Sequence, residues 1–141
     1  MQSAHIPDHV FRWPLRVYYE DTDAAGVVYH ANYLKYCERA RTEWLRALGL
    51  DQRNLRAEQG LVFVVSKLTA DYLRGAELDD ALEVRSCVAQ LGQARIVFEQ
   101  SVWRGDERMF VSNVTIACVD WAARRAVRLP ENVRALLETI A

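Results

Sequence analysis

Cysteine, proline and glycine are all scarce in this chain: its 141 residues contain three, three and six of them respectively. The cysteines, Cys37, Cys87 and Cys118, are odd in number and widely spaced, with no Cys-x-x-Cys pair. This spacing argues against a disulfide framework and against a zinc site, so we expect free thiols in a reducing compartment. No linker, internal repeat or low-complexity tract interrupts the sequence either, and its length predicts a single domain over residues 1–141.

An excess of charge of one sign is also missing. The 18 basic and 19 acidic residues leave a net charge of −1, whereas a protein that binds nucleic acid electrostatically normally carries a basic stripe. No apolar run approaches the roughly 20 residues of a membrane span. The segment from Met1 to His9 has neither a basic start nor an apolar signal core, so we expect a flexible N-terminal segment over residues 1–9 and a cytoplasmic protein.

The motifs of several common chemistries are absent from the sequence. There is no Gly-x-Ser-x-Gly elbow of a serine hydrolase, and no glycine-rich phosphate loop precedes a Lys-Ser or Lys-Thr pair. The run Asp21-Thr22-Asp23 is similar to the start of a calcium loop, but Ala25 and Asn32 occupy positions where such a loop needs ligands. We therefore expect neither a metal nor a redox cofactor.

Alternating residues predict a strand near the beginning of the chain. Apolar side chains recur at every second position from Phe11 to Tyr19, which is the period of a strand. Pro14 lies within this run and has no N–H to donate, so we expect an exposed or edge position there. From Asn32 to Leu48 the apolar period becomes helical, and Gly49 is a natural end for this helix.

Four more strands and a short helix are predicted in the second half of the chain. The strand candidates extend over 61–73, 82–88, 96–102 and 110–119, and a closing helix follows Pro130. Short connections between these strands favour an antiparallel sheet. One sheet and one long apolar helix can bury their apolar surfaces together if the sheet curls around the helix. The sequence thus predicts an α+β fold of this kind.

Polar and titratable side chains are concentrated in residues 19–33, between the first strand and the long helix. They are Tyr19, Glu20, Asp21, Asp23, Tyr29 and His30. Gly26 stands where the chain must turn. A carboxylate beside a helix N-terminus, whose free N–H groups can bind an oxyanion, is suited to acyl transfer. On spacing alone, a helix-capping role for Asp23 and a structural role for His30 are the simpler interpretations.

The same block resembles a known enzyme family. Its pattern Tyr19-x-x-x-Asp23-x-x-Gly26-Val27-Val28-x-His30-x-Asn32-Tyr33 is similar to that of acyl-CoA thioesterases of the 4-hydroxybenzoyl-CoA thioesterase family. The strand Leu15-Arg16-Val17-Tyr18-Tyr19 and the helix segment Glu38-Arg39-Ala40-Arg41-Thr42-Glu43 resemble the branch associated with the Tol–Pal cell-envelope system. The resemblance is tight over residues 11–50 and looser to about residue 138, and it implies a hot-dog fold.

The resemblance also implies roles for individual residues. Asp23 falls on the family's catalytic aspartate, which acts either as a general base that activates water or as a nucleophile that attacks the thioester carbonyl. His30 would position water or the thioester, and Tyr19 would hydrogen-bond Asp23 or the substrate. Gly26 and Tyr29 are the expected substrate-binding residues of the turn. Backbone N–H groups from Tyr29 to Ala31 would polarise the carbonyl.

Basic residues at the mouth of the site would help to hold coenzyme A, because the coenzyme carries phosphates. Arg95 stands near a segment that contacts the coenzyme in the family. Lys67, Arg74 and Arg104 are further candidates, although a solvated charge is the simpler interpretation for each. The implied substrate is an acyl-CoA, or an acyl carrier protein thioester in its place. The implied assembly is a homodimer or homotetramer whose sites form where two subunits meet.

The carboxylates beside Asp23 have simpler expected roles. Asp21 either tunes Asp23 by like-charge repulsion or accepts hydrogen bonds from backbone N–H groups of the turn, and we favour the turn. Glu20 is expected to be a solvated charge.

Two rival functions remain open from the sequence. A hot-dog hydratase or dehydratase needs an acid and a base at adjacent substrate carbons, which the spacing of Asp23, Gly26 and His30 fits less well. A non-catalytic module that binds acyl-CoA or acyl carrier protein in envelope assembly has no need of a carboxylate base. Asp23 therefore favours the thioesterase.

Overall fold

The computed structural model of the protein describes residues 9–141. Apart from His9, the expected flexible segment 1–9 lies outside the described residues. Within the described range, no helix has the length and apolar character needed to cross a membrane. In chain order the elements are β1 (Phe11–Arg16), the 3₁₀ turn η1 (Tyr19–Asp21), α1 (Asn32–Ala47), α2 (Gln52–Gln59), β2 (Leu61–Tyr72), β3 (Ala81–Leu91), β4 (Arg95–Arg104), β5 (Glu107–Asp120), β6 (Arg125–Ala126) and α3 (Glu131–Glu138).

The strands form one antiparallel sheet in the order β1-β3-β4-β5-β2, with the two-residue β6 beside β5. β1 is therefore an edge strand, and Pro14 on it is exposed, as predicted from its missing N–H. β2 forms the opposite edge and pairs with β5 along its whole length. This second edge is long and carries exposed apolar side chains, Val65 and Leu68.

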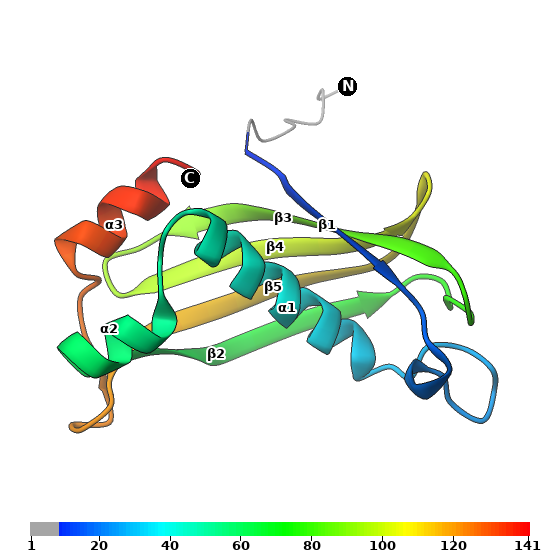
Figure 1. Ribbon diagram of the computed structural model, residues 1–141, viewed down its shortest axis with the longest axis horizontal. Coiled ribbons are helices and arrows are strands. Elements are labelled where there is room, and N and C mark those ends of the chain that lie inside the picture. Colours follow the sequence, from blue (N-terminus) through cyan, green and yellow to red (C-terminus); the bar gives the residue numbers. More distant parts are fainter. Residues whose placement is uncertain (1–8) are drawn as a thin grey trace.

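Helix α1 lies across one face of the sheet, with α2 and α3 gathered near its C-terminal end (Figure 1). The helix is covered over much of its circumference, as its wide apolar stripe predicts; its buried residues are Asn32, Tyr33, Tyr36, Cys37, Ala40, Trp44 and Leu45. The sheet curls around this helix and supplies side chains such as Val84, Phe98 and Val102, each at most 1% exposed. This arrangement confirms the predicted hot-dog fold.

Buried apolar residues form two clusters along α1. At the C-terminal half of the helix, Trp44 stacks on Phe11 at 5.8 Å between ring centroids and meets Phe98 edge-on at 5.9 Å. At the N-terminal half, Tyr33 stacks on Phe110 at 5.1 Å. The second cluster lies directly beneath the turn that carries the candidate site, so the turn rests on a packed support.

Four local features differ from the prediction. The first strand ends at Arg16 rather than at Tyr19, because the chain enters η1, where the Thr22 N–H donates to the Tyr19 carbonyl at 3.2 Å. The eight-residue helix α2 and the short strand β6 are not predicted at all. The closing helix α3 is predicted correctly, but Pro130 caps it from outside instead of lying in its first turn.

Candidate active site

Residues 22–28 form a tight reversal, called the Asp23 turn below. Thr22 and Val28 pair as an antiparallel bridge, and the Asp23 N–H donates to the Val27 carbonyl at 2.8 Å. The chain reverses at Gly26, whose N–H donates to the Asp23 carbonyl at 3.0 Å. The φ of Gly26 is +86°, in the left-handed region that glycine reaches without strain. Gly26 thus shapes the turn, as its place in the sequence predicts.

The Asp23 side chain is exposed on this turn, and only one of its two carboxylate oxygens accepts a hydrogen bond within it. Its Oδ1 accepts a hydrogen bond from the Ala25 N–H at 2.9 Å, which fixes the direction of the carboxylate. Within residues 9–141 its Oδ2 has no hydrogen-bond partner. One oxygen is therefore anchored, and the other is left for a water molecule or a substrate atom.

Asp21 organises the turn, which agrees with the favoured prediction for it. Its Oδ2 accepts from the Tyr18 N–H at 2.8 Å. Its carbonyl accepts both the Tyr29 N–H and the Asn32 side-chain amide, each at 2.9 Å. These bonds join η1 to the start of α1, so that Asp23 is held between two fixed ends.

Tyr19 and Glu20 point away from this arrangement. Tyr19 is 82% exposed, and among the described residues no hydrogen bond joins its hydroxyl to Asp23. The contact with Asp23 that the resemblance implies is not formed in this structure, which leaves contact with substrate as the role open to Tyr19. Glu20 is exposed, as expected of a solvated charge.

The start of α1 offers two unused backbone donors. The Tyr29 N–H is already bonded to the Asp21 carbonyl, and the Asn32 N–H to the Tyr29 carbonyl at 2.8 Å. The N–H groups of His30 and Ala31, in contrast, have no partner in the described part of the chain. No side chain caps this end of the helix, whose dipole favours negative charge. Of the three predicted donors from Tyr29 to Ala31, two are thus available to an oxyanion.

The Asp23 turn, the start of α1 and the end of β2 enclose a groove of about 330 Å³, called the Asp23 groove below. It is lined by Asp23, Val27, Val28, His30, Tyr33, Tyr72, Leu73, Arg74 and Gly75. Two of the predicted catalytic residues, Asp23 and His30, therefore face one cavity. Of the lining residues supplied by the β2–β3 loop, Arg74 is among the predicted basic candidates, whereas Leu73 and Gly75 are not predicted, because no local pattern says what the loop approaches.

Two tyrosine hydroxyls form hydrogen bonds between the elements that line the groove. The Tyr72 hydroxyl donates to the His30 carbonyl at 2.8 Å and joins the end of β2 to the start of α1. The Tyr33 hydroxyl accepts the Ala76 N–H at 3.0 Å. A phenol is already neutral at physiological pH, and burial raises the pKa of Tyr33 further, so the hydroxyl keeps a proton of its own to donate.

Two of the predicted basic residues, Arg74 and Arg95, lie at opposite ends of the sheet. Arg74 lines the Asp23 groove and pairs with Glu107 at 3.2 Å. Arg95 is exposed at the start of β4 opposite Ala117, whereas Tyr72 at the groove pairs with Phe110. That difference of seven residues on β5 corresponds to about 23 Å along a strand. Arg95 and Asp23 are not brought together within one chain.

The three thiols are free and lie outside the Asp23 groove. Cys37 and Cys118 are buried, and Cys87 is partly buried on β3. Burial raises the pKa of Cys37 to about 11, so that it stays a neutral thiol and a poor nucleophile at physiological pH. No cysteine competes with Asp23 for a nucleophilic role at this groove.

Comparison with known proteins shows the family of the chain. The chain is 48% identical over 128 residues to an acyl-CoA thioesterase YbgC of Haemophilus influenzae, covering 91% of this chain and 94% of that relative. A probable thioesterase from Bartonella henselae of known structure is 35% identical, with a TM-score of 0.81 over 86% of this chain and 99% of its own.

The fold likeness extends to more distant structures. A 4-hydroxybenzoyl-CoA thioesterase mutant, solved with 4-hydroxybenzoyl-CoA bound, has a TM-score of 0.85 at 22% identity and covers 92% of this chain and 99% of its own. The model of the thioesterase-like superfamily matches residues 17–137, a range that contains the Asp23 turn, α1 and the whole sheet after β1. The chain belongs to the thioesterase-like superfamily.

Proposed function

We propose that this thioesterase hydrolyses acyl-CoA at the Asp23 groove, giving a carboxylate and free coenzyme A. The observation that carries the proposal is that a half-anchored carboxylate and the unpaired N–H of His30 lie at one groove, with the unpaired N–H of Ala31 next to His30 in the chain. The first group can activate or deliver an oxygen nucleophile, and the second can stabilise negative charge on the carbonyl oxygen. Acyl-CoA is the substrate class in the name of the Haemophilus influenzae relative.

The reaction can follow two routes at this site. As a general base, Asp23 takes a proton from water; the hydroxyl oxygen attacks the thioester carbon, the C–S bond breaks and the thiolate leaves with that proton. As a nucleophile, the Asp23 carboxylate attacks the carbonyl, expels the thiolate and forms an anhydride that water then hydrolyses. In both routes the carbonyl oxygen becomes negative and accepts hydrogen bonds from the His30 and Ala31 N–H groups.

One further feature supports acyl-CoA as the ligand of this groove. Arg74 lines it with a side chain that is 65% exposed, so that its guanidinium can exchange Glu107 for a phosphate oxygen. An acyl carrier protein thioester presents the same pantetheine arm and is the second candidate substrate.

We also propose a cytoplasmic location, because the three free thiols stay reduced in that compartment.

Replacing His30 with alanine should lower kcat about tenfold or more while weakening substrate binding less. The reason is that His30 lines the groove and would align water or the thioester, and small misplacements of reacting groups are costly. Steady-state kinetics with one acyl-CoA checks this. His9→Ala, which removes an exposed histidine before β1, is the matched control. A change in thermal stability with unchanged kinetics would make His30 a structural residue.

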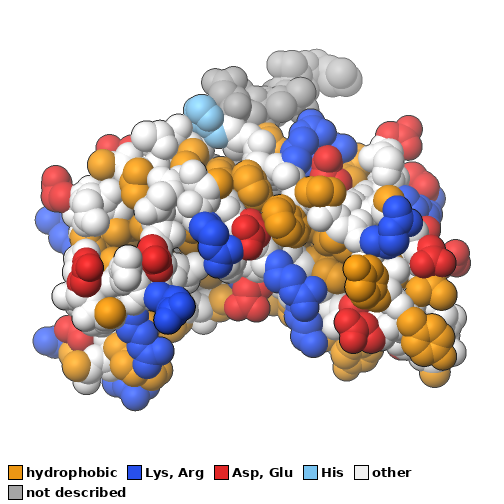
Figure 2. All heavy atoms as spheres, viewed as in Figure 1, with side chains coloured by type: hydrophobic (Ala, Val, Ile, Leu, Met, Phe, Trp, Pro, Cys, Tyr) orange, Lys and Arg blue, Asp and Glu red, His pale blue; other side chains and the backbone are white. Residues whose placement is uncertain are grey.

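We further propose that two copies of the chain share each site. β2 is an open sheet edge, on which Val65 is 54% exposed and Leu68 39% exposed. The lower side of the molecule in the view of Figure 1, along which β2 lies, is hollowed between two lobes (Figure 2). A groove of about 260 Å³ separates α1 from β2 and contains both Glu38 and Arg41. Two copies related by a two-fold axis would each offer a carboxylate to the other's guanidinium. Arg95 could then serve a substrate bound mainly to the partner.

The chain should accordingly be active only as an oligomer. Light scattering and activity measured across the same dilution series should fall together, because an isolated chain would lack the part of the site that its partner supplies. The matched variant is Leu68→Arg, which places a charge on the exposed edge and should shift both curves to higher protein concentration. A fully active species with the mass of one 16.2 kDa chain would rule out the shared site.

A panel of acyl-CoAs of increasing length, with detection of released thiol, tests the function itself. We expect thiol release with at least one member of the panel, and the preferred length identifies the acyl group. A hydratase or dehydratase would change the acyl chain and leave the thioester intact. A binding module would hold the acyl-CoA without turnover. Either result would remove the hydrolase proposal.

A further inference from the structure

The β2–β3 loop, residues 73–80, holds the Asp23 turn from one side. The Val28 N–H donates to the Ala76 carbonyl at 2.8 Å, and the Ala76 N–H donates to the Tyr33 hydroxyl at 3.0 Å. Val27 and Glu77 also pair as an antiparallel bridge. Ala76 itself is fully buried, so that these bonds have no competing water. The position of Asp23 therefore depends on the position of this loop.

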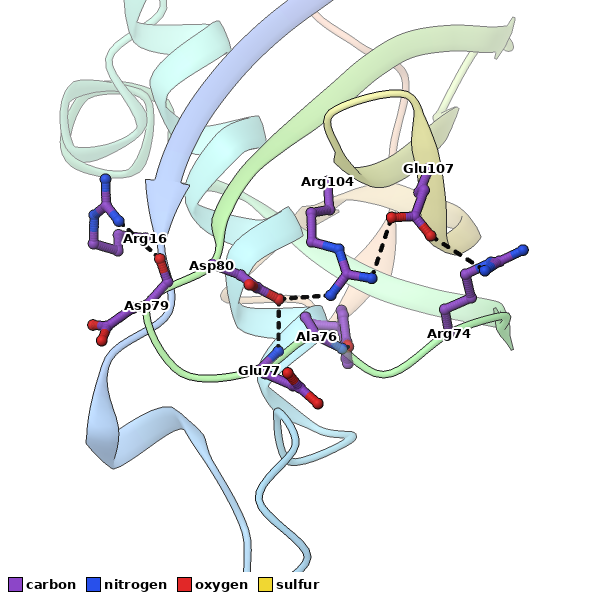
Figure 3. A network of polar contacts seen from close by, with 9 residues as sticks. Arg16, Arg74, Ala76, Glu77, Asp79, Asp80, Arg104 and Glu107 are labelled. Atoms are coloured by element: carbon purple, nitrogen blue, oxygen red, sulfur yellow. Dashed lines mark hydrogen bonds and ion pairs between the residues drawn. The ribbon is translucent and has the colours of Figure 1, made fainter.

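Several contacts hold this loop in turn, and one of them comes from an arginine in a different part of the sheet. Arg104, the last residue of β4, donates to the Asp80 carboxylate at 2.9 Å (Figure 3). The same Asp80 oxygen accepts the Glu77 N–H at 2.8 Å, which closes the loop on itself. Arg104 also reaches Glu107 at 3.3 Å, and Glu107 pairs with Arg74 at the Asp23 groove. A continuous set of contacts thus joins the β4–β5 hairpin to the groove.

The Asp80–Arg104 contact is stronger than an ordinary surface ion pair. The two side chains are only 22% and 32% exposed, and a partly buried charge pair is less screened by water and salt. Burial alone would raise the pKa of Asp80, but the Glu77 N–H and the Arg104 guanidinium outweigh it and hold the pKa below its usual value. Asp80 is therefore a fixed anion around which the loop is built.

The loop also contains backbone that needs such support. Asp79 has a φ of +71°, a backbone conformation that residues other than glycine rarely adopt. Its N–H donates to the Val17 carbonyl at 3.0 Å, and its carbonyl accepts from Arg16 at 2.8 Å. A strained residue persists where its surroundings determine its conformation. Removing one of the contacts that hold the loop should let its backbone relax, and Ala76 would move with it.

We propose that Arg104, acting through Asp80, is a positioning residue for hydrolysis at Asp23. Arg104 does not line the groove; it fixes the loop whose backbone at Ala76 holds Val28 and Tyr33 in place. This inference rests on the proposed role of Asp23. The functional consequence is geometric: when the loop loosens, the carboxylate and the His30 N–H group no longer meet the thioester carbonyl together.

Arg104→Met is the primary test, since methionine keeps much of the apolar stem and removes the charged fork. We expect kcat to fall roughly 10- to 10²-fold, the usual cost of misplacing a reacting group by about 1 Å. Arg104→Lys should recover part of the loss, because it keeps a positive charge next to Asp80. Arg12→Met is the matched control: it removes an exposed ion pair to Glu83 on the same sheet and should leave kcat unchanged.

The Asp23→Asn background separates positioning from general damage. If Arg104 acts through the Asp23 turn, Arg104→Met should lower the already reduced kcat of Asp23→Asn little further. Amide exchange gives a readout that does not need activity. In Arg104→Met the N–H groups of Val28 and Ala76 should exchange faster, while those of the β4–β5 pairs, such as Phe98 and Val114, keep their protection.

The outcomes separate the two proposals. The positioning role would be overturned, with Asp23 still catalytic, if kcat is unchanged in Arg104→Met. It would also be overturned if Arg104→Met lowers kcat by the same factor in the wild-type and in the Asp23→Asn background. If Asp23→Asn is fully active, the proposed function of Asp23 fails, and the exchange of Val28 still decides whether Arg104 holds the turn. Should Arg104→Met not fold, Asp80→Asn replaces it in the same measurements, because it keeps an oxygen for the Glu77 N–H and loses the charge.

Discussion

The Asp23→Asn variant should fold normally, and its kcat for acyl-CoA hydrolysis should be lower by a factor of roughly 10²–10⁴. The asparagine side chain has the same shape and keeps an oxygen that can accept the Ala25 N–H, so the turn should persist. What it loses is the ability to take a proton from water or to attack the carbonyl as an anion. Circular dichroism and light scattering should match the wild type, and kcat should not.

Asp21→Asn is the matched control for this experiment. It makes the same chemical change two residues away, at a carboxylate whose oxygen accepts the Tyr18 N–H and does not line the Asp23 groove. Because an amide oxygen can still accept that bond, most of kcat should remain. Equal losses in the two variants would show that the charge of the turn, rather than the Asp23 carboxylate itself, supports turnover.

Tyr33→Ala should lower the free energy of unfolding by about 3–5 kcal/mol, the usual cost of truncating a buried aromatic side chain. Tyr33 is 2% exposed and contacts the rings of Phe110, Tyr72 and Tyr36. Its hydroxyl also accepts the buried Ala76 N–H, so that the alanine variant loses both packing and the anchor of the β2–β3 loop. Urea unfolding at a fixed protein concentration measures the change.

Tyr33→Phe divides this effect into its two parts. Phenylalanine keeps the ring contacts and leaves the Ala76 N–H buried without a partner, which should cost about 1–3 kcal/mol. Its kcat should fall even where the protein is fully folded, because Ala76 also holds Val28 of the Asp23 turn. If Tyr33→Phe has the stability and activity of the wild type, the hydroxyl has no part in holding the loop.

The long elements of the fold could be predicted because their patterns repeat. α1 and the strands β3 to β5 each present several buried side chains at one period, and β2 is a long run rich in β-branched and aromatic residues; the predicted ranges agree with the observed ones to within a few residues. α2 could not be found in this way, since Leu55 is its only buried residue. Its signals are at its ends: Asp51 caps it through the Arg53 and Asn54 N–H groups, and Gly60 ends it at φ +67°.

The site could be predicted only where its residues lie close together in the sequence. Asp23, Gly26 and His30 fall within one turn and the residues just before one helix, so the family resemblance points to them together, whereas spacing alone favours a capping role for Asp23 and a structural role for His30. The β2–β3 loop reaches the turn through Ala76, whose partner Tyr33 is 43 residues earlier in the chain. No local pattern encodes such a pairing, and the same holds for Arg104 and Asp80. Tyr19 is misjudged as a strand residue because alternation continues through an irregular turn.

The most direct test of the account is a product analysis of one acyl-CoA with the wild-type chain and with Asp23→Asn. We expect the wild-type protein to release free thiol and free carboxylic acid mole for mole, and the variant to do so roughly 10²–10⁴ times more slowly. Turnover by well-folded Asp23→Asn at the wild-type rate, or an acyl-CoA that the wild type binds without releasing thiol, would contradict it.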